Sequence, residues 1–312
     1  MESSLHDSAL LALSFFAFLM PPQDPKDVLV RELGKRQYGP ARPSDDLAKE
    51  SWEFALLSAS AYENSWAEQI ATLATDPGEA RKWQDVIEAR WDRWTDFPSD
   101  ALKASAEQRD LYFDIYESRP EADKKRLVIA FRGTDGANWL DWRTNLRICT
   151  RFIPKFRDQY SVVADELVDE FGRRLVERDL NSDDVEIVTT GHSLGGGLAQ
   201  QFAYAFKVPE DLDTTLQPVS SVYAFHSSPV TGSHSVAKED RDRNCKDLRI
   251  DRIFEHGEIL AYLRLFLSLF SPPSALAPTV REIRFNFVES KSTTTNHEIQ
   301  DFAMLLAEKA HA

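Results

Sequence analysis

Gly191-His192-Ser193-Leu194-Gly195-Gly196-Gly197 decides both the expected fold and the expected chemistry of this chain. The stretch follows an apolar run, 185–190, that predicts a strand, and it opens a segment, 194–206, with apolar residues at helical spacing. A serine with a glycine two positions before it and another two after it, at a strand-to-helix turn, is typical of an exposed nucleophile. The glycines let neighbouring backbone pass close by, and the positive end of the helix favours negative charge at the serine.

The alternative for this stretch is a glycine-rich helix entry that binds a phosphate. Its glycines do not have the spacing of a Walker A loop, and the chain contains no Gly-Lys-Ser or Gly-Lys-Thr. We therefore interpret Ser193 as a nucleophile.

Strands and helices alternate along most of the chain. Apolar runs predict strands over 111–115, 127–131, 185–190, 219–225, 252–255 and 281–288. Apolar residues three or four apart predict helices over 52–62, 83–94, 160–175, 194–206 and 299–307. This alternation implies an α/β fold with a mostly parallel sheet and helices on both faces. The tryptophans of the 83–94 segment are expected in the core, with an acyl-chain groove as the alternative.

Composition narrows the classes of protein. The chain has 312 residues, 42% of them hydrophobic, which suffices for a large core. A net charge of −14 argues against a nucleic-acid partner, which would need a basic face. Cys149 and Cys245 are too few for a disulfide scaffold and lack the spacing of a zinc site. We expect both to be reduced, mostly buried thiols.

The N-terminal region contains a 12-residue apolar run, 9–20. Its leader has no Lys or Arg and Pro21-Pro22 follows it, unlike a secretory signal. The run is also shorter than the ~20 residues of a membrane-spanning helix. We expect a helix docked on the protein, with an interfacial anchor as the alternative. A cytoplasmic location is the default, and export without a signal peptide stays open. Five prolines make 21–43 an expected irregular connection.

A serine that attacks a carbonyl needs N–H donors for the oxyanion that forms. In this strand–turn–helix arrangement one donor is the residue after the nucleophile, here Leu194. Thr134 follows the buried strand 127–131, and ligand sites of open α/β sheets lie at the carboxyl ends of strands. Thr134 is therefore the candidate for the second donor. A plain strand-ending turn is the alternative.

These segments resemble the class 3 lipases of the α/β-hydrolase superfamily. The likeness is carried, in family order, by 128–134, Asp141-Trp142, Thr144-Asn145-Leu146, 191–199, 224–232, 252–259 and Asn296-His297. It implies an α/β-hydrolase domain over 46–312, preceded by the apolar segment and irregular connection of 1–45. It also implies a serine-dependent hydrolase of lipid esters, a lipase or phospholipase, that forms an acyl-enzyme on Ser193.

The chain order of this fold, Ser then Asp or Glu then His, directs the choice of acid and base. His297 starts the last predicted helix, where Thr295 and Glu298 have the spacing of a capping box. A surface histidine is the alternative. Glu258 lies three residues past a predicted strand, where the family generally has Asp. Glu255, at the end of that strand, stays open as the rival acid.

In the expected mechanism His297 takes the Ser193 proton, the serine attacks an ester carbonyl, and the acid orients the imidazole. No metal or organic cofactor is required. Trp139, Leu140 and Trp142 follow the oxyanion segment where the family's lid commonly sits, and core packing is their alternative. The expected partners are a lipid or ester substrate and a membrane or lipid interface, with no nucleic acid.

Three other functions stay open. A thioesterase or acyltransferase would use the same triad with a different leaving group or acceptor. A phospholipase effector that damages membranes would share the chemistry. A lipid-binding protein on a non-catalytic hydrolase fold is the alternative outside enzymes.

Overall fold

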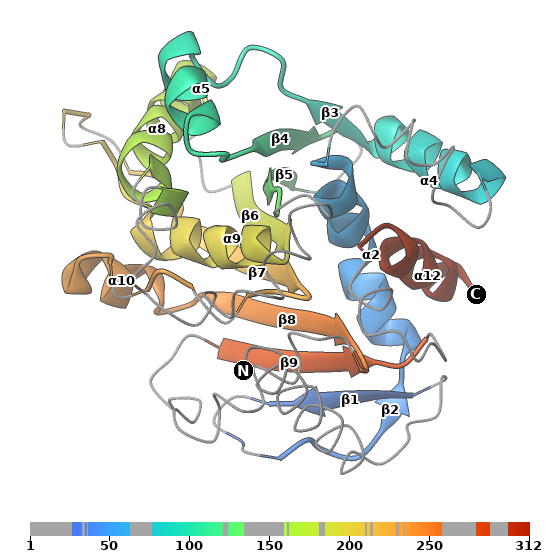
Figure 1. Cartoon of the computed structure of the whole chain (residues 1–312). Coiled ribbons are helices and arrows are strands. Elements are labelled where there is room, and N and C mark those ends of the chain that lie inside the picture. Colours follow the sequence, from blue (N-terminus) through green and yellow to red (C-terminus); the bar gives the residue numbers. More distant parts are fainter. Residues whose placement is uncertain are drawn as a thin grey trace, which may run out of the picture.

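A nine-stranded sheet organises the described part of the computed structural model (Figure 1). The structure describes residues 27–32, 35, 37–62, 77–120, 124–133, 159–160, 162–180, 185–209, 211–212, 215–228, 231–233, 235–257, 279–287 and 299–312. The strands are β1 (Asp27–Arg31), β2 (Arg42–Pro43), β3 (Trp91–Arg93), β4 (Phe113–Ser118), β5 (Lys125–Phe131), β6 (Val185–His192), β7 (Val219–Phe225), β8 (Arg249–Glu255) and β9 (Thr279–Phe285). The helices are α2 (Asp45–Ser60), α4 (Pro77–Arg90), α5 (Asp100–Glu107), a π-helical turn (Val163–Leu167) leading into α8 (Val168–Glu177), α9 (Leu194–Ala205), α10 (Lys238–Asn244) and α12 (Ile299–His311).

The sheet is parallel in its middle and antiparallel at both edges. Its strand order is β2-β1-β9-β8-β7-β6-β5-β4-β3. Strands β5 to β9 pair in parallel, whereas β4 and β3 on one side and β1 and β2 on the other pair antiparallel. The carboxyl ends of the parallel strands therefore meet at one edge of the sheet, where α/β proteins build their sites.

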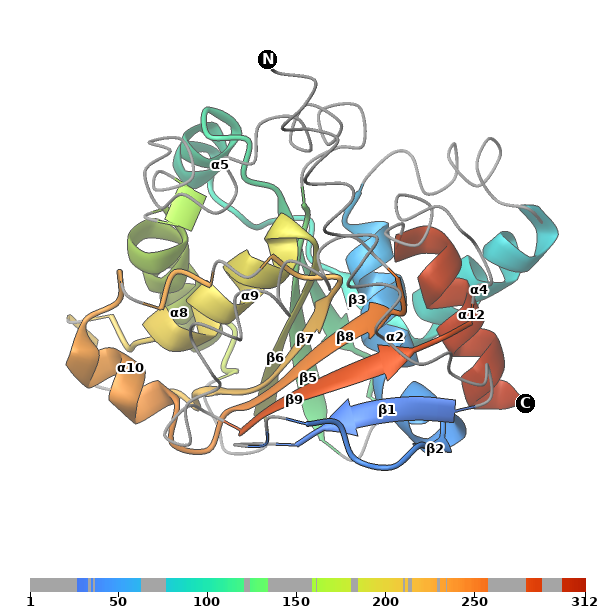
Figure 2. The ribbon, with the colours of Figure 1, turned by 60° about the horizontal axis from the view of Figure 1, so that its bottom comes forward.

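Helices cover both faces of the sheet (Figure 2). Helices α8 and α9 pack on one face, and α2 and α12 pack on the other. Strand β5 serves both layers, because Leu127, Ile129 and Phe131 belong to the α8–α9 core while Val128 and Ala130 belong to the α2–α12 core. A strand buried on both faces is expected to be a continuous apolar run. The predicted α/β fold with helices on both faces is confirmed.

Two predictions about secondary structure are wrong. The helix predicted over 83–94 ends at Arg90, and Trp91 begins β3, because Trp91–Arg93 pairs with 116–118 of β4. Strand pairing thus overrides the helical spacing of Trp83, Trp91 and Trp94, although all three are buried in the core, as expected.

The irregular connection expected over 21–43 is also wrong for the parts that form β1 and β2. Strand β1 pairs with β9, and its Val28 and Val30 are fully buried. The sheet therefore includes residues before 46, while the apolar run 9–20 lies outside the described residues.

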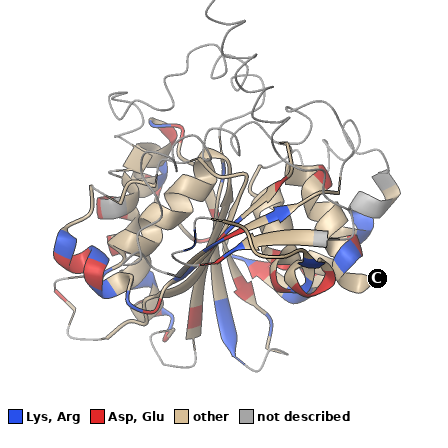
Figure 3. Ribbon diagram, turned by 90° about the horizontal axis from the view of Figure 1, so that it is seen from below, with Lys and Arg blue, Asp and Glu red and all other residues tan. Residues whose placement is uncertain are grey.

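The surface of the described elements carries both signs of charge. Figure 3 shows Lys and Arg interspersed with Asp and Glu, most densely on α10. That helix pairs Lys238 with Asp242 and Arg243 with Asp240 along its own length. No helix within the described ranges has the length and apolar character needed to cross a membrane.

Candidate active site

Ser193 lies on a sharp turn between β6 and α9. Its backbone has φ 56° and ψ −121°, a conformation that few residues other than glycine adopt. The Ser193 N–H donates to the Phe225 carbonyl at 3.0 Å, and the Ser193 carbonyl accepts from the N–H groups of Gly196 at 3.2 Å and Ser228 at 2.9 Å. Backbone bonds to α9 and to the end of β7 thus hold the strained turn, as functional sites often require.

Glycines allow three backbone segments to meet around Ser193. A Cβ on Gly191 would lie 2.4 Å from the Gly195 carbonyl group, and a Cβ on Gly195 would lie 2.2 Å from the Phe131 oxygen. Real Cβ atoms do not approach backbone this closely. The close packing that the sequence predicted around this turn is therefore present, and α9 begins against the end of β5.

Leu194 is the first residue of α9. The first four N–H groups of a helix have no acceptor within it, and they form its positive end. The Leu194 side chain is buried in the core between α9 and the sheet. This core contact anchors the first residue of α9, which directly follows Ser193.

Tyr62, at the end of α2, joins the segment after β5 to the residue before the serine. Its hydroxyl accepts the Gly133 N–H at 3.0 Å and lies 2.7 Å from Nδ1 of His192. A Cβ on Gly133 would lie 2.6 Å from the His192 oxygen and 3.1 Å from Cβ of Ser193. Sequence reasoning missed Tyr62, because no motif or spacing marks a tyrosine at a helix end as part of a site.

His226 ties the ends of β7 and β8 together. It has φ 42°, and its N–H donates to the Ile253 carbonyl at 2.8 Å. Its Nε2 accepts the Glu255 N–H at 3.1 Å, so the ring nitrogen that faces β8 carries no proton. The ring also lies edge-on to His192, with centroids 5.6 Å apart, and contacts Phe302 of α12 at 4.7 Å. His226 is fully buried.

Several predicted site residues lie outside the described residues. They are Thr134, Trp139, Leu140, Trp142, Glu258 and His297. Glu255, the rival acid, is the last residue of β8 and only 1% exposed. It therefore stands at the carboxyl edge of the sheet, two strands away from the strand that precedes Ser193.

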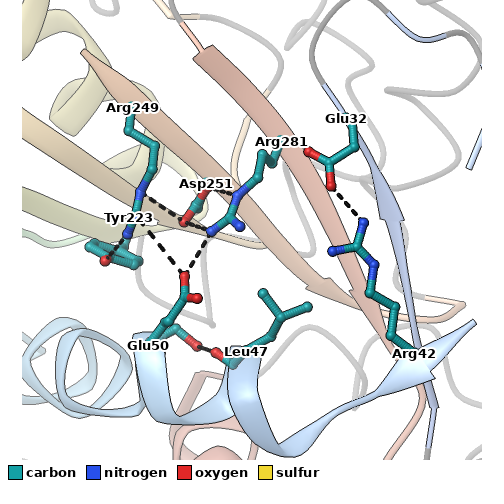
Figure 4. Close-up of polar contacts among 9 residues, drawn as sticks. Glu32, Arg42, Leu47, Glu50, Tyr223, Arg249, Asp251 and Arg281 are labelled. Atoms are coloured by element: carbon teal, nitrogen blue, oxygen red, sulfur yellow. Dashed lines mark hydrogen bonds and ion pairs between the residues drawn. The ribbon is translucent and has the colours of Figure 1, made fainter. Parts of the chain in front are cut away.

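Asp251 lies inside β8, which begins earlier than the strand predicted over 252–255, and its polar contacts link neighbouring elements of the fold. Both of its carboxylate oxygens accept from Arg281, at 2.8 and 2.7 Å, and Arg249 approaches at 3.4 Å (Figure 4). Glu50 of α2 pairs with the same Arg281 at 2.9 Å. This cluster joins β8, β9 and α2, and Asp251 is only 1% exposed.

His256 begins the turn after β8. Its N–H donates to the Phe285 carbonyl at 2.7 Å, which holds it to the end of β9. Burial, together with the nearby Arg284, lowers the pKa of His256 below its ordinary value of 6.5. No group of three or more His, Cys, Asp or Glu in the described ranges could hold a metal ion.

One family model matches this chain. The model of a phospholipase family, described as a Tle-like phospholipase domain, matches residues 53–211. A search of the curated proteins finds no match.

The solved structures that resemble this chain include lipases. A propeptide complex of Rhizomucor miehei lipase is 17% identical, covers 83% of this chain and 74% of its own, and has a TM-score of 0.41. Lipase II from Rhizopus niveus is 14% identical, covers 86% and 95%, and has a TM-score of 0.44. The M37 lipase is 13% identical, covers 85% and 79%, and has a TM-score of 0.40.

Proposed function

The chain belongs to the family of Tle-like phospholipase domains and is a lipase-like α/β-hydrolase, and we propose that it cleaves carboxylic esters of phospholipids through an acyl-enzyme on Ser193. The observation that carries the proposal is the backbone of Ser193, at φ 56° and ψ −121° between a parallel strand and a helix. A serine held this way at the carboxyl edge of a sheet is poised for attack on a carbonyl. The family's description supports phospholipid over other esters.

Leu194 and Thr134 are the proposed oxyanion donors. Leu194 opens α9, so its N–H is among those without an acceptor inside the helix, and the positive helix end adds to the field. Gly133, the residue before Thr134, approaches Ser193 closely. Two donors at this turn would face the oxygen of a carbonyl under attack by Ser193.

His297 is the proposed base. Two other histidines after Ser193, His226 and His311, each have a ring nitrogen that bonds a backbone group, and this supports the choice of His297. Nε2 of His226 accepts the Glu255 N–H, and Nδ1 of His311 lies 2.8 Å from the Ala307 carbonyl oxygen within α12.

The proposed reaction has two steps. In the first, His297 takes the Ser193 hydroxyl proton while the serine oxygen adds to the ester carbonyl; the imidazolium then gives the proton to the departing alcohol, which leaves an acyl-serine. In the second, His297 takes a proton from water as the water oxygen adds to the acyl carbonyl; the imidazolium then returns that proton to the departing Ser193 oxygen, which releases the fatty acid and restores the serine hydroxyl and the neutral imidazole. Glu258 holds the imidazole in the required tautomer and stabilises its cation.

The test is fatty-acid release by the wild type and Ser193→Ala. Substrates are vesicles of phosphatidylcholine, phosphatidylethanolamine or phosphatidylglycerol, a triacylglycerol emulsion and soluble p-nitrophenyl butyrate. Ser51→Ala is a matched control, since this buried serine of α2 bonds its own helix at the Leu47 carbonyl. We expect release from vesicles that Ser193→Ala abolishes and Ser51→Ala retains. Hydrolysis of the soluble ester alone would refute the phospholipid part, and activity that survives in Ser193→Ala would refute the mechanism.

The acid is tested by comparing Glu258→Gln with Glu255→Gln. Loss of the triad carboxylate is expected to lower kcat by about 10³-fold or more, because the imidazole loses its orientation. Glu255→Gln removes a charge at the end of β8 and should cost less than about tenfold if Glu258 is the acid. The reverse order would assign the role to Glu255.

A further inference from the structure

Side-chain contacts link the carboxyl ends of four neighbouring strands, one of which leads into Ser193. Strands β5, β6, β7 and β8 lie side by side and parallel (Figure 2). Gly133 follows β5, His192 ends β6, His226 follows β7 and Glu255 ends β8. Tyr62 connects the first two, the histidine rings contact each other, and His226 accepts the Glu255 N–H. Each strand end that flanks the nucleophile is thus linked to the next by a side chain.

The Tyr62 hydroxyl can bond Gly133 and His192 at the same time. A tyrosine hydroxyl has one proton to donate and lone pairs to accept with. It accepts the Gly133 N–H at 3.0 Å, and its second contact is with His192 Nδ1 at 2.7 Å. Whichever of the two carries the proton of that second bond, a lone pair remains for Gly133. The contact with Gly133 therefore survives either tautomer of His192.

The backbone of Gly133 must be held in place by a neighbouring group, because a glycine backbone is flexible. Its backbone lies so close to the serine turn that a Cβ would meet the His192 oxygen at 2.6 Å and Ser193 Cβ at 3.1 Å. Only glycine fits, and glycine has the least restricted backbone of any residue. A hydrogen bond from its N–H to a side chain anchored on α2 limits that freedom at the entry to the proposed oxyanion segment.

We propose that Tyr62 is a positioning residue for oxyanion stabilisation: its hydroxyl holds the backbone of Gly133, the residue directly before the proposed oxyanion donor Thr134. The inference depends on the proposed function, because it concerns the same serine. Tyr62 itself does not touch the reacting atoms. It acts on the rate of the chemical step through the backbone of Gly133.

Tyr62→Phe is the matched perturbation. The ring stays and continues to pack near His192, whose centroid lies 5.7 Å away, while the hydroxyl is lost. Removing a whole oxyanion donor costs about 10²–10³ in kcat, and a donor that is displaced but present should cost about tenfold. We expect kcat for p-nitrophenyl butyrate to fall about tenfold, with KM within twofold of the wild type.

An ester and thionoester pair separates positioning from a structural role. Sulfur accepts hydrogen bonds more weakly than oxygen, so the wild type should hydrolyse the oxygen ester faster than the matched thionoester. Tyr62→Phe should reduce that rate ratio by the same factor of about ten, because it weakens only the stabilisation that oxygen receives. A variant with less folded protein would lower both rates equally. Tyr116→Phe, which removes another buried hydroxyl on β4, should leave the ratio unchanged.

Amide hydrogen exchange provides a second readout that needs no turnover. The Gly133 amide should exchange faster in Tyr62→Phe than in the wild type and keep its wild-type rate in Tyr116→Phe. An unchanged rate ratio, or an unchanged Gly133 exchange rate, would overturn the positioning role even if the wild type is an active esterase. Equal fatty-acid release by the wild type and Ser193→Ala would instead overturn the proposed function, so the two failures are distinct.

Discussion

Gly195→Ala tests whether the contact between α9 and β5 sets the position of the nucleophile. A Cβ at this position would lie 2.2 Å from the Phe131 oxygen and 2.8 Å from the Arg132 carbonyl carbon, where ordinary contacts begin at 3.4 Å. The difference from the oxygen contact, 3.4 − 2.2, is 1.2 Å, so the two elements must separate by about 1 Å. Strand β5 is paired on both sides, by β4 and β6, so most of the movement falls on α9.

Ser193 immediately precedes α9 and moves with it. A misplacement of about 1 Å can cost about 10²-fold in rate, which corresponds to about 2.7 kcal/mol of transition-state stabilisation. The cost in folding stability should be smaller. Overpacking lowers the free energy of unfolding by about 1–3 kcal/mol, whereas the higher helix propensity of alanine over glycine raises it by up to about 1 kcal/mol. We therefore expect a folded protein whose kcat/KM on a soluble ester is about 10²-fold below that of the wild type.

Gly172→Ala is the matched control. Its Cβ would also be crowded, at 2.8 Å from Cδ of Pro209, but Pro209 lies in a loop after α9, away from Ser193. Both variants should show modest shifts in thermal midpoint, whereas only Gly195→Ala should lose activity. A Gly195→Ala enzyme within threefold of the wild type, with an altered thermal midpoint, would refute the argument, because α9 would then yield without displacing the serine.

Two further predictions concern stability. Asp251→Asn should lower the free energy of unfolding in urea by about 3 kcal/mol, because it removes the buried partner of Arg281; a loss below about 1 kcal/mol would contradict this role. His256→Gln should reduce the fall in thermal midpoint between about pH 7 and pH 5. Burial and Arg284 lower the folded-state pKa of His256 below 6.5, so the unfolded chain binds its proton more readily and wild-type stability decreases as the pH drops through that range. Equal slopes in the wild type and the variant would show that His256 does not contribute.

The parallel middle of the sheet was predictable because its sequence is locally consistent. The run 127–131 is apolar throughout, as a strand buried between two helical layers must be, and β7 has the predicted bounds 219–225. The serine turn was predictable for a similar reason. A strand, a tight turn and a helix within seven residues leave few conformations, and glycine at 191 is required by a contact with Gly195, which is nearby in the sequence; glycine at 195 is required by the more distant Phe131.

The edges of the sheet were not predictable in the same way. Trp91 continues a helical spacing, yet its partner on β4 is Ser118, and nothing near residue 91 encodes that pairing. Strand β1 lies among prolines and charges and gains its place from β9, which is more than 240 residues away in the sequence. Whether such a segment forms a strand depends on which distant strand it can pair with, and the local sequence pattern does not show that pairing.

The histidines after Ser193 show what spatial neighbours add to chain order at the candidate site. Chain order favours His297 over His226, because an acid segment must come between the serine and the base, and the neighbours of His226 in space give a second reason to set that histidine aside. His226 packs edge-on to the ring of His192 and accepts the Glu255 N–H of β8, so its ring joins the residue before Ser193 to the end of β8. A base must instead keep one nitrogen for the serine proton and the other for the acid. Since the β8 amide occupies Nε2 of His226, that ring cannot meet both requirements. The contacts of His226 therefore support the assignment of the base to His297. We expect His226→Gln to retain part of the wild-type kcat and His297→Gln to retain none, and this difference would bear out the distinction.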